Sequence, residues 1–276
     1  MKGALVCLSV FISYVSSAAE SIVEDVGFTS GGITLSGSIV FPAGDIQAGV
    51  VFVHGSGKQT RNLGIARRFA QDGIATLVYD KRGVGDSGGE YESEQSVSEK
   101  NLTLLANDAL AALQTLAKQP RLSGKNLGLT GISQAGWIVP LAAEATDLAD
   151  FMVLWSGPVC RVSEEDIFSK YTADADKSGV PGYQEALEAR EHPYVWPAFL
   201  GKDTDSSTSL DKTRIPGLWI FGAEDGSVPV DLSIERLEQL IDDGHDYEYI
   251  LFSSLGHNNM QETFATATDW IKRTAK

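Results

Sequence analysis

Cysteine and basic residues are both scarce in this sequence, and each scarcity excludes a class of protein. The 276 residues include two cysteines, Cys7 and Cys160, so a hydrophobic core and not a disulfide framework must stabilise the fold. Lysine and arginine together number 22 against 37 aspartates and glutamates, which gives a formal net charge of −15. A chain this acidic repels nucleic acid and anionic membrane surfaces, and we expect neither as a partner.

Motifs for metals and phosphate-bearing cofactors are also missing. The sequence has no HExxH, no cysteine and histidine cluster with metal-ligand spacing, and no GxxxxGK[ST] loop. We therefore expect no metal and no cofactor. The hydrophobic content of 43% and the charged content of 21% are those of an ordinary globular protein, and the length suits one large domain.

An apolar run at the N-terminus is too short to span a bilayer. Lys2 gives this segment a positive start, residues 3–15 are mostly apolar, and VSSAAES supplies a small-residue cleavage site. We interpret residues 1–19 as a signal peptide cleaved after Ala19, and expect an exported protein, periplasmic or secreted, with no stable membrane anchor. Cleavage would leave Cys160 as the only cysteine, and we expect it to be a buried small hydrophobe.

Apolar strands alternate with helical patterns along residues 20–276. Two strands joined at Gly31-Gly32 form a predicted hairpin. Apolar segments such as AGVVFVHG, IATLVYD and NLGLTG then precede segments with helical spacing, for example residues 99–117. This alternation predicts an α/β fold with a mostly parallel sheet and helices on both faces. Ligands of such sheets bind at the edge where the carboxyl ends of the strands meet.

The alternation breaks once, between residues 159 and 214. This segment is too long for an ordinary loop and too rich in aromatic side chains for a disordered linker. We interpret it as a mainly helical insertion over the strand edge. Its His192 and Trp196, together with Trp137 outside it, are candidates for lining a substrate pocket.

The stretch GISQAGW, residues 131–137, lies where an apolar strand runs into a helix. A serine in this place can simply cap the helix. A nucleophile elbow, by contrast, needs small residues around its serine, because the sharp turn brings the backbone close to its neighbours. Gly131, Ala135 and Gly136 meet that need, with an alanine in place of the more usual glycine. Ser133 is therefore a candidate nucleophile.

An acid and a histidine follow the serine in the chain order typical of one class of serine hydrolase. His257 in LGHNN comes after the last predicted strand, and Asp225 in FGAEDGSVP comes after the strand before it. Both should reach the same sheet edge as Ser133. Glu224 is a competing acid, and we prefer Asp225 because Gly226 beside it permits a tight turn.

We do not expect two further histidines to be catalytic. The side chain of His54, in HGSG, is interpreted as structural. His245 precedes a strand, so we expect it at the opposite sheet edge and in solvent.

Acyl transfer also needs backbone amides that stabilise an oxyanion. The amide of Gln134, directly after the serine, supplies one. The second is expected from HGSG, at Ser56 or at its neighbour Gly55, because glycines there let the backbone approach a substrate carbonyl.

Together, HGSG, DKRGVGDSGG, GISQAG, GAEDGSVP and a late GH resemble the α/β-hydrolase superfamily, above all its bacterial esterase and serine-aminopeptidase-like branches. The motifs occur in the family's order and cover nearly all of residues 20–276. The resemblance implies a sheet of the eight-stranded type and identifies the insertion with the family's lid. It also implies that Asp80, Arg82 and Ser87 brace the loop beside the oxyanion site.

We therefore expect a serine hydrolase that cleaves carboxylic esters, with a small-molecule ester or a short peptide as substrate. A peptidase of the same fold is the alternative. Glu164, Glu165 and Asp166 would bind the amine of its substrate, although a solvated helix start is the simpler account of these three residues. A non-catalytic binding protein on the same scaffold is a more remote alternative.

Overall fold

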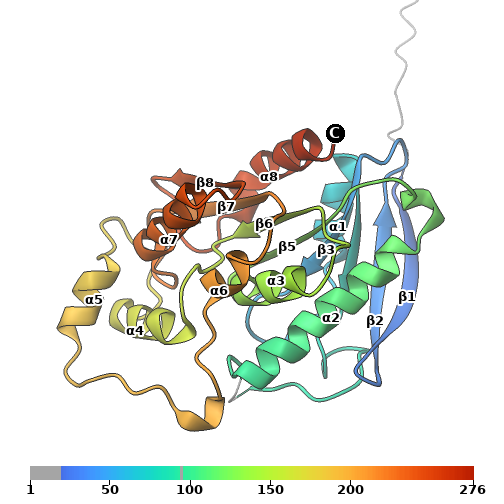
Figure 1. Ribbon diagram of the computed structural model, residues 1–276. Helices are drawn as coiled ribbons and strands as arrows, with labels where there is room; N and C mark the ends of the chain where they lie inside the picture. Colours follow the sequence, from blue (N-terminus) through green and yellow to red (C-terminus); the bar gives the residue numbers. More distant parts are fainter. Residues whose placement is uncertain (1–19, 94–95) are drawn as a thin grey trace, which may run out of the picture.

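The computed structural model describes residues 20–93 and 96–276, and an eight-stranded sheet forms its centre (Figure 1). The predicted signal peptide, residues 1–19, lies outside the described residues. Along the sheet the strand order is β1-β2-β4-β3-β5-β6-β7-β8. The strands are β1 (Ile22–Ser30), β2 (Ile33–Phe41), β3 (Ala48–Val53), β4 (Ile74–Tyr79), β5 (Leu127–Ile132), β6 (Phe151–Trp155), β7 (Gly217–Gly222) and β8 (Tyr247–Phe252).

The strand directions follow from the sequence pattern. β2 runs antiparallel to both β1 and β4, and the strands from β3 to β8 are parallel. The hairpin between β1 and β2 turns at Gly31 and Gly32, whose φ angles of +56° and +79° are the left-handed values that favour glycine. Parallel strands covered on both faces must be apolar throughout, and β3, β4, β6 and β7 are buried along their whole length. The predicted α/β fold is confirmed.

Helices cover both faces of this sheet (Figure 1). One apolar core lies between the sheet and α2, α3 and α7, and a second lies between the sheet and α1 and α8. No helix of the described residues is long and apolar enough to cross a bilayer. The helices of the two layers are α1 (Leu63–Gln71), α2 (Glu99–Ala117), α3 (Ala135–Glu144), α7 (Val230–Asp242) and α8 (Met260–Thr274).

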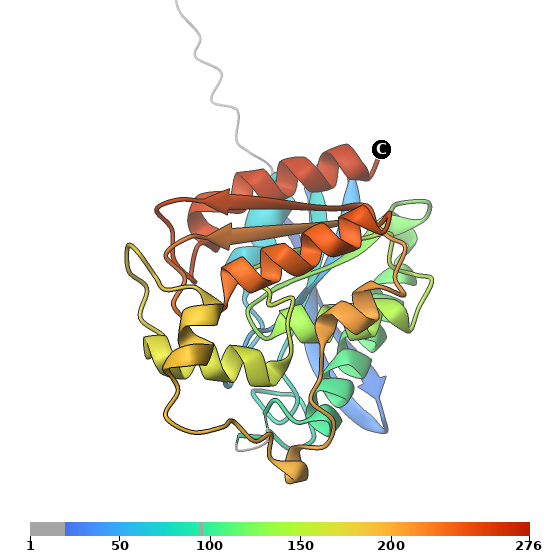
Figure 2. The same ribbon diagram turned by 60° about the vertical axis from the view of Figure 1, so that its left-hand side comes forward.

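Residues 159–214 contain three short helices, α4 (Val162–Thr172), α5 (Tyr183–Ala189) and α6 (Ser206–Leu210). α4 and α5 pack against each other, whereas α6 packs against α3 and α7. An antiparallel bridge between Arg161 and Asp205 closes the base of this insertion. Figure 2 shows α4 and α5 on the side toward which β7 and β8 point. Cys160, at the start of the insertion, is fully buried, as expected.

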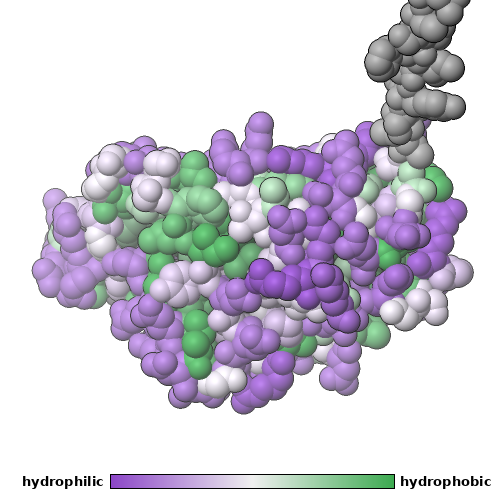
Figure 3. Space-filling view, turned by 90° about the horizontal axis from the view of Figure 1, so that it is seen from above, coloured by the Kyte–Doolittle hydropathy of each residue, from purple (hydrophilic) through white to green (hydrophobic). Residues whose placement is uncertain are grey.

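The molecular surface is uneven in polarity. Seen from above, the face is mostly hydrophilic, with apolar side chains gathered on the side of α7 and β8 (Figure 3). β8 is an edge strand, and its Leu251 is 46% exposed.

A buried ion pair ties the loop after β4 to α2. Arg82 Nε donates to Asp108 Oδ2 at 3.0 Å, and Arg82 Nη2 bonds the other carboxylate oxygen. Asp108 is 0% exposed. In the same loop, Ser87 Oγ donates to the Asp80 carbonyl at 2.7 Å, and the Asp80 carboxylate accepts from the Arg61 amide at 2.7 Å. These contacts fix the chain between β4 and α2.

We expect Asp108→Ala to lower the free energy of unfolding by about 3–5 kcal/mol, because it leaves the Arg82 charge buried without a partner. Asp147→Ala, at an exposed aspartate, should change that free energy by less than about 0.5 kcal/mol. Urea denaturation measures both. Replacing the whole pair, as in Arg82→Met/Asp108→Leu, should cost less than Asp108→Ala alone, and a larger cost would contradict this account of the pair.

Candidate active site

Ser133 occupies a sharp turn between β5 and α3. Its φ of +57° is a left-handed value that a residue with a side chain rarely adopts. Two backbone hydrogen bonds hold the turn: the Ser133 amide donates to the Trp155 carbonyl at 3.0 Å, and the Gly136 amide donates to the Ser133 carbonyl at 2.7 Å. Such strain is retained where the surrounding structure enforces it, and it is common at functional sites.

The small residues around Ser133 are required by close contacts. A β-carbon at Gly131 would lie 2.5 Å from both the Val53 carbonyl oxygen and the Ala135 methyl carbon. At Gly136 it would lie 2.4 Å from Pro158 Cδ. The methyl group of Ala135 fits only because position 131 is glycine. The alanine in this motif is therefore compatible with a nucleophile elbow.

His257 and Asp225 meet at the same sheet edge. His257 Nδ1 lies 2.9 Å from Asp225 Oδ2 and 3.1 Å from Oδ1. Asp225 is 1% exposed, and its Oδ1 accepts from the amides of Ser227 and Val228 at 2.8 and 2.9 Å. The tight turn expected after Asp225 is present, and Asp225, not Glu224, is the carboxylate that bonds the histidine.

The environment of His257 favours its protonated form. Burial opposes a charge on the ring, but the hydrogen bond and charge of Asp225 outweigh it. With smaller effects of Asp176 and Glu165, they raise the pKa of His257 above its ordinary value. The backbone is held as well, because Ser156 Oγ donates to the His257 carbonyl at 2.8 Å. His257 is therefore a fixed and comparatively strong base.

Asp176 is a site residue that the sequence did not indicate. It belongs to the insertion, and its two carboxylate oxygens accept from the Gly226 amide at 2.9 Å and from the His257 amide at 3.0 Å. A β-carbon at Gly256 would lie 2.2 Å from Asp176 Oδ2. One carboxylate thus joins the loop that carries Asp225 to the loop that carries His257. The sequence signals are only the glycines at 226 and 256.

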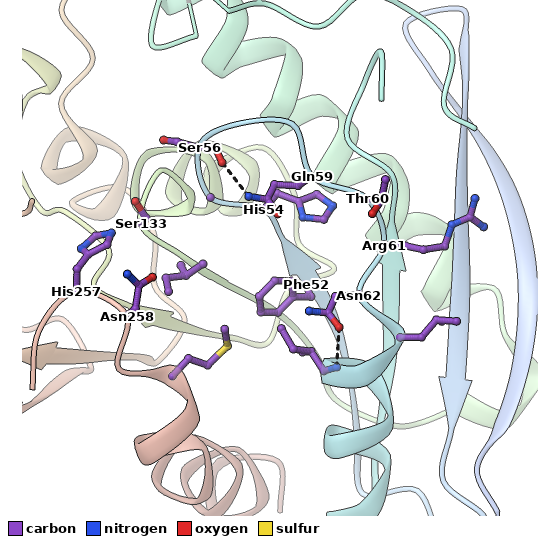
Figure 4. A pocket seen from close by; sticks show the side chains of 15 residues that line it. Phe52, His54, Ser56, Gln59, Thr60, Arg61, Asn62, Ser133, His257 and Asn258 are labelled. Atoms are coloured by element: carbon purple, nitrogen blue, oxygen red, sulfur yellow. Dashed lines mark hydrogen bonds between the residues drawn. The ribbon is translucent and has the colours of Figure 1, made fainter. Parts of the chain in front are cut away.

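A cavity of about 560 Å³ opens beside Ser133 and His257. Figure 4 shows the Ser133 hydroxyl next to the imidazole ring, with the loop after β3 across the cavity. The structure contains no hydrogen bond from Ser133 to His257, and such bonds often tighten only when substrate binds. Polar side chains dominate the remaining lining: Ser56, Gln59, Thr60, Arg61, Asn62 and Asn258.

The three residues predicted to line the substrate pocket do not line this cavity. Trp137 is 3% exposed, and its indole N–H donates to the Cys160 carbonyl at 2.8 Å, because it lies on the core side of α3. The Trp196 indole N–H donates to Gly201, within the insertion, and His192 is exposed. That prediction is corrected.

The backbone around the predicted oxyanion amides lies against Ser133. A β-carbon at Gly55 would be 3.5 Å from Ser133 Cβ and 3.1 Å from the Ile132 carbonyl oxygen. Ser56 follows Gly55 and lines the cavity. Gln134 begins the helical turn directly after the serine. No described residue accepts a hydrogen bond from the Ser56 or Gln134 amide.

The remaining histidines have structural environments. His54 is buried with its Nε2 on the Tyr79 carbonyl, and burial lowers its pKa to about 4, so the ring stays neutral. His245 lies at the opposite sheet edge, as expected, but it is buried and not in solvent: its Nδ1 lies 3.1 Å from the Thr213 carbonyl oxygen. Within residues 20–93 and 96–276, no three histidine, cysteine, aspartate or glutamate side chains are arranged to hold a metal ion.

The model of the prolyl oligopeptidase family matches residues 64–276. A polyketide transferase of Penicillium crustosum is 33% identical over 102 residues, which are 37% of this chain and 31% of that protein. Thus the match spans about a third of the curated relative.

Among solved structures, an esterase of Pyrococcus furiosus aligns with a TM-score of 0.67 at 17% identity, over 92% of this chain and 90% of that chain. Acetyl xylan esterase 1 of Thermoanaerobacterium gives 0.67 at 15% identity, over 96% and 86%. The acylaminoacyl peptidase of Pyrococcus horikoshii gives 0.68 at 18% identity, over 94% of this chain and 42% of that one. These structures share the fold.

We expect Asp176→Asn to lower the pKa of His257, because it removes one of the negative charges that favour the imidazolium. An NMR titration of the histidine ring measures this. Asp174→Asn is the matched control: it removes the same charge from an exposed position with left-handed backbone, which asparagine tolerates. It should shift the His257 pKa less. Equal shifts in the two variants would contradict a specific role of Asp176.

Proposed function

The chain belongs to the prolyl oligopeptidase family, and we propose that it is a serine hydrolase that cleaves carboxylic esters through an acyl-enzyme intermediate. The observation that carries this proposal is the joint geometry of three residues. Ser133 stands on a left-handed turn at the wall of an open cavity, beside a histidine whose Nδ1 bonds the buried Asp225 at 2.9 Å.

The proposed reaction begins at the Ser133 hydroxyl. Ser133 Oγ attacks the acyl carbon of the substrate while His257 Nε2 accepts the hydroxyl proton. Asp225 accepts the Nδ1–H, which fixes the ring tautomer and stabilises the imidazolium. The proton then passes from His257 to the departing alcohol oxygen. Water, deprotonated by the same histidine, attacks the acyl-enzyme and releases the carboxylic acid.

Negative charge develops on the carbonyl oxygen in both steps. In our proposal the amides of Gln134 and Ser56 donate to this oxygen. Both belong to segments that adjoin Ser133, and neither bonds another described residue. Fixed donors of this kind stabilise the tetrahedral intermediate more than the ground state, and so raise kcat.

The cavity lining supports an ester in preference to a peptide with a free N-terminus. No aspartate or glutamate is among the described residues that line it, so a substrate ammonium would find no opposite charge there. Neutral hydrogen-bonding groups such as those of Gln59, Thr60 and Asn62 suit an uncharged polar substrate.

A peptidase is the second candidate, and Glu165 is the observation that favours it. Of the three acidic residues considered for binding an amine, Glu164 pairs with Arg236 at 2.7 Å and Asp166 with Lys170 at 2.7 Å. The Glu165 carboxylate, by contrast, makes no hydrogen bond or ion pair with a described residue. Burial, with Asp166 and other nearby carboxylates, raises the pKa of Glu165 to about 8, and a substrate ammonium would reverse that shift.

Relative rates on an aryl ester and an aminoacyl arylamide separate the two candidates. The proposed function predicts the higher kcat/KM for the ester, with little effect of Glu165→Gln. A preference for the arylamide that Glu165→Gln removes would instead support the peptidase.

We expect Ser133→Ala to lower kcat/KM for p-nitrophenyl ester hydrolysis by about 10⁴- to 10⁶-fold, because no other group can form the acyl-enzyme. Ser254→Ala, at an exposed serine close to His257 in the chain, should keep the wild-type rate. Circular dichroism checks that both variants are folded. Substantial hydrolysis by folded Ser133→Ala protein would refute the assignment of the nucleophile.

A further inference from the structure

Lys81 is a buried cation behind the proposed oxyanion site. It is 4% exposed. Its Nζ donates to the Gly55 carbonyl oxygen at 2.8 Å and to Gln134 Oε1 at 2.8 Å. Among the described residues it has no carboxylate partner, so both acceptors of this charge are neutral groups.

The two acceptors belong to the two proposed oxyanion donors. The Gly55 carbonyl and the Ser56 N–H are the two ends of one peptide unit. The second acceptor is the side chain of Gln134, whose backbone amide is the other donor, and its Nε2 is held in turn by the Ser96 carbonyl at 3.0 Å. A single ammonium therefore connects the HGSG loop with the start of α3.

This arrangement carries an energetic cost that core packing does not explain. A lysine without a counter-charge loses most of its hydration when it is buried, and burial lowers the pKa of Lys81 to about 8. Its neighbours in the DKRG segment have ionic partners: the Asp80 carboxylate pairs with Arg61 at 2.8 Å, and Arg82 pairs with Asp108. Lys81 alone of the three points toward the candidate site.

We propose that Lys81 is a positioning residue of the oxyanion site, which holds the Ser56 and Gln134 amides in place and strengthens the Ser56 N–H as a donor. The inference rests on the proposed hydrolase function. A hydrogen bond to a carbonyl oxygen polarises the whole peptide unit, so the N–H at its other end becomes a better donor. The ammonium also attracts the developing oxyanion directly.

The charge state of Lys81 then enters the rate. The rings of His54 and Tyr91 lie near its ammonium. The His54 ring stays neutral near pH 7 because burial lowers its pKa to about 4, and the Tyr91 ring has its centroid 6.0 Å from Lys81 Nζ. Lys58 lies over the same Tyr91 ring at 5.6 Å but bonds neither oxyanion segment. Removal of the Lys81 proton, as pH rises through about 8, should therefore lower kcat.

The test is ester hydrolysis by Lys81→Met, with Lys58→Met as the control that removes a nearby positive charge. We expect Lys81→Met to lower kcat about 10- to 100-fold with little change in KM, because the oxyanion forms only after attack. Affinity for a boronic acid that forms a tetrahedral adduct should fall by a similar factor. Lys58→Met should resemble the wild type.

The pH profile provides a readout that a purely structural role would not move. The wild type should lose kcat above about pH 8, and this alkaline limb should be absent from Lys81→Met. Lys81→Arg keeps the charge at high pH, so it should recover part of the lost kcat and also lack the limb.

Three results would overturn the proposal: Lys81→Met with kcat within twofold of the wild type, a loss confined to KM, or an alkaline limb that persists in Lys81→Arg. The pH profile of Lys81→Arg tests the proposal even if Lys81→Met does not fold. Failure of the proposed function would look different, because the wild type itself would not hydrolyse the ester.

Discussion

The left-handed backbone of Ser133 is the constraint on which the rest of the site depends. A residue with a side chain held at a φ of +57° costs about 1–3 kcal/mol, and the surrounding sheet must enforce it. The Trp155 carbonyl on β6 accepts the Ser133 amide, and the close approach of Val53 on β3 leaves room only for glycine at 131. The central strands thus hold the turn that carries Ser133 at the sheet edge, and Gln134 begins the helical turn directly after it.

Charges of opposite sign lie on the two sides of this turn. On the histidine side, the carboxylates of Asp225, Asp176 and Glu165 favour a protonated imidazole. On the oxyanion side, the ammonium of Lys81 bonds the carbonyl behind the Ser56 amide. In our account, the carboxylates favour transfer of the serine proton to the histidine. The ammonium favours the negative charge that builds on the substrate oxygen at the same time. The protein prepares this field before substrate arrives, and substrate binding need not reorganise it.

The insertion takes part in this field as well as in the shape of the molecule. Through Asp176 it bonds the backbone of both loops that position the acid and the base, and the Lys177 amide donates to the Glu224 carbonyl at 3.1 Å. A displacement of this segment would therefore disturb the backbone of the two loops that carry Asp225 and His257.

How much the sequence could predict follows from the range of the interactions involved. Strand alternation, the Gly31-Gly32 hairpin and the spacing of residues 99–117 are local patterns, and the structure has β1, β2 and α2 where those patterns place them. Ser133, Asp225 and His257 were found because each follows a strand that ends at one edge.

Asp176 and Lys81 act through contacts with residues distant in the chain, for which no periodic pattern exists. Dependence on contacts between residues distant in the chain also explains why the predictions for Trp137 and His245 were wrong. Trp137 is close to Ser133 in the sequence, but the helical turn points its side chain into the core and away from the predicted pocket. The position of His245 before a strand predicts the correct sheet edge, but its ring is buried beside Thr213 and not in solvent.

A crystal structure of the protein inhibited by an alkyl fluorophosphonate would test the central claim most directly. The account predicts phosphorus bonded to Ser133 Oγ and the phosphonyl oxygen about 3 Å from the amides of both Gln134 and Ser56, with Lys81 still bonded to the Gly55 carbonyl. Phosphorus on another residue, or a phosphonyl oxygen that points away from those two amides, would contradict it.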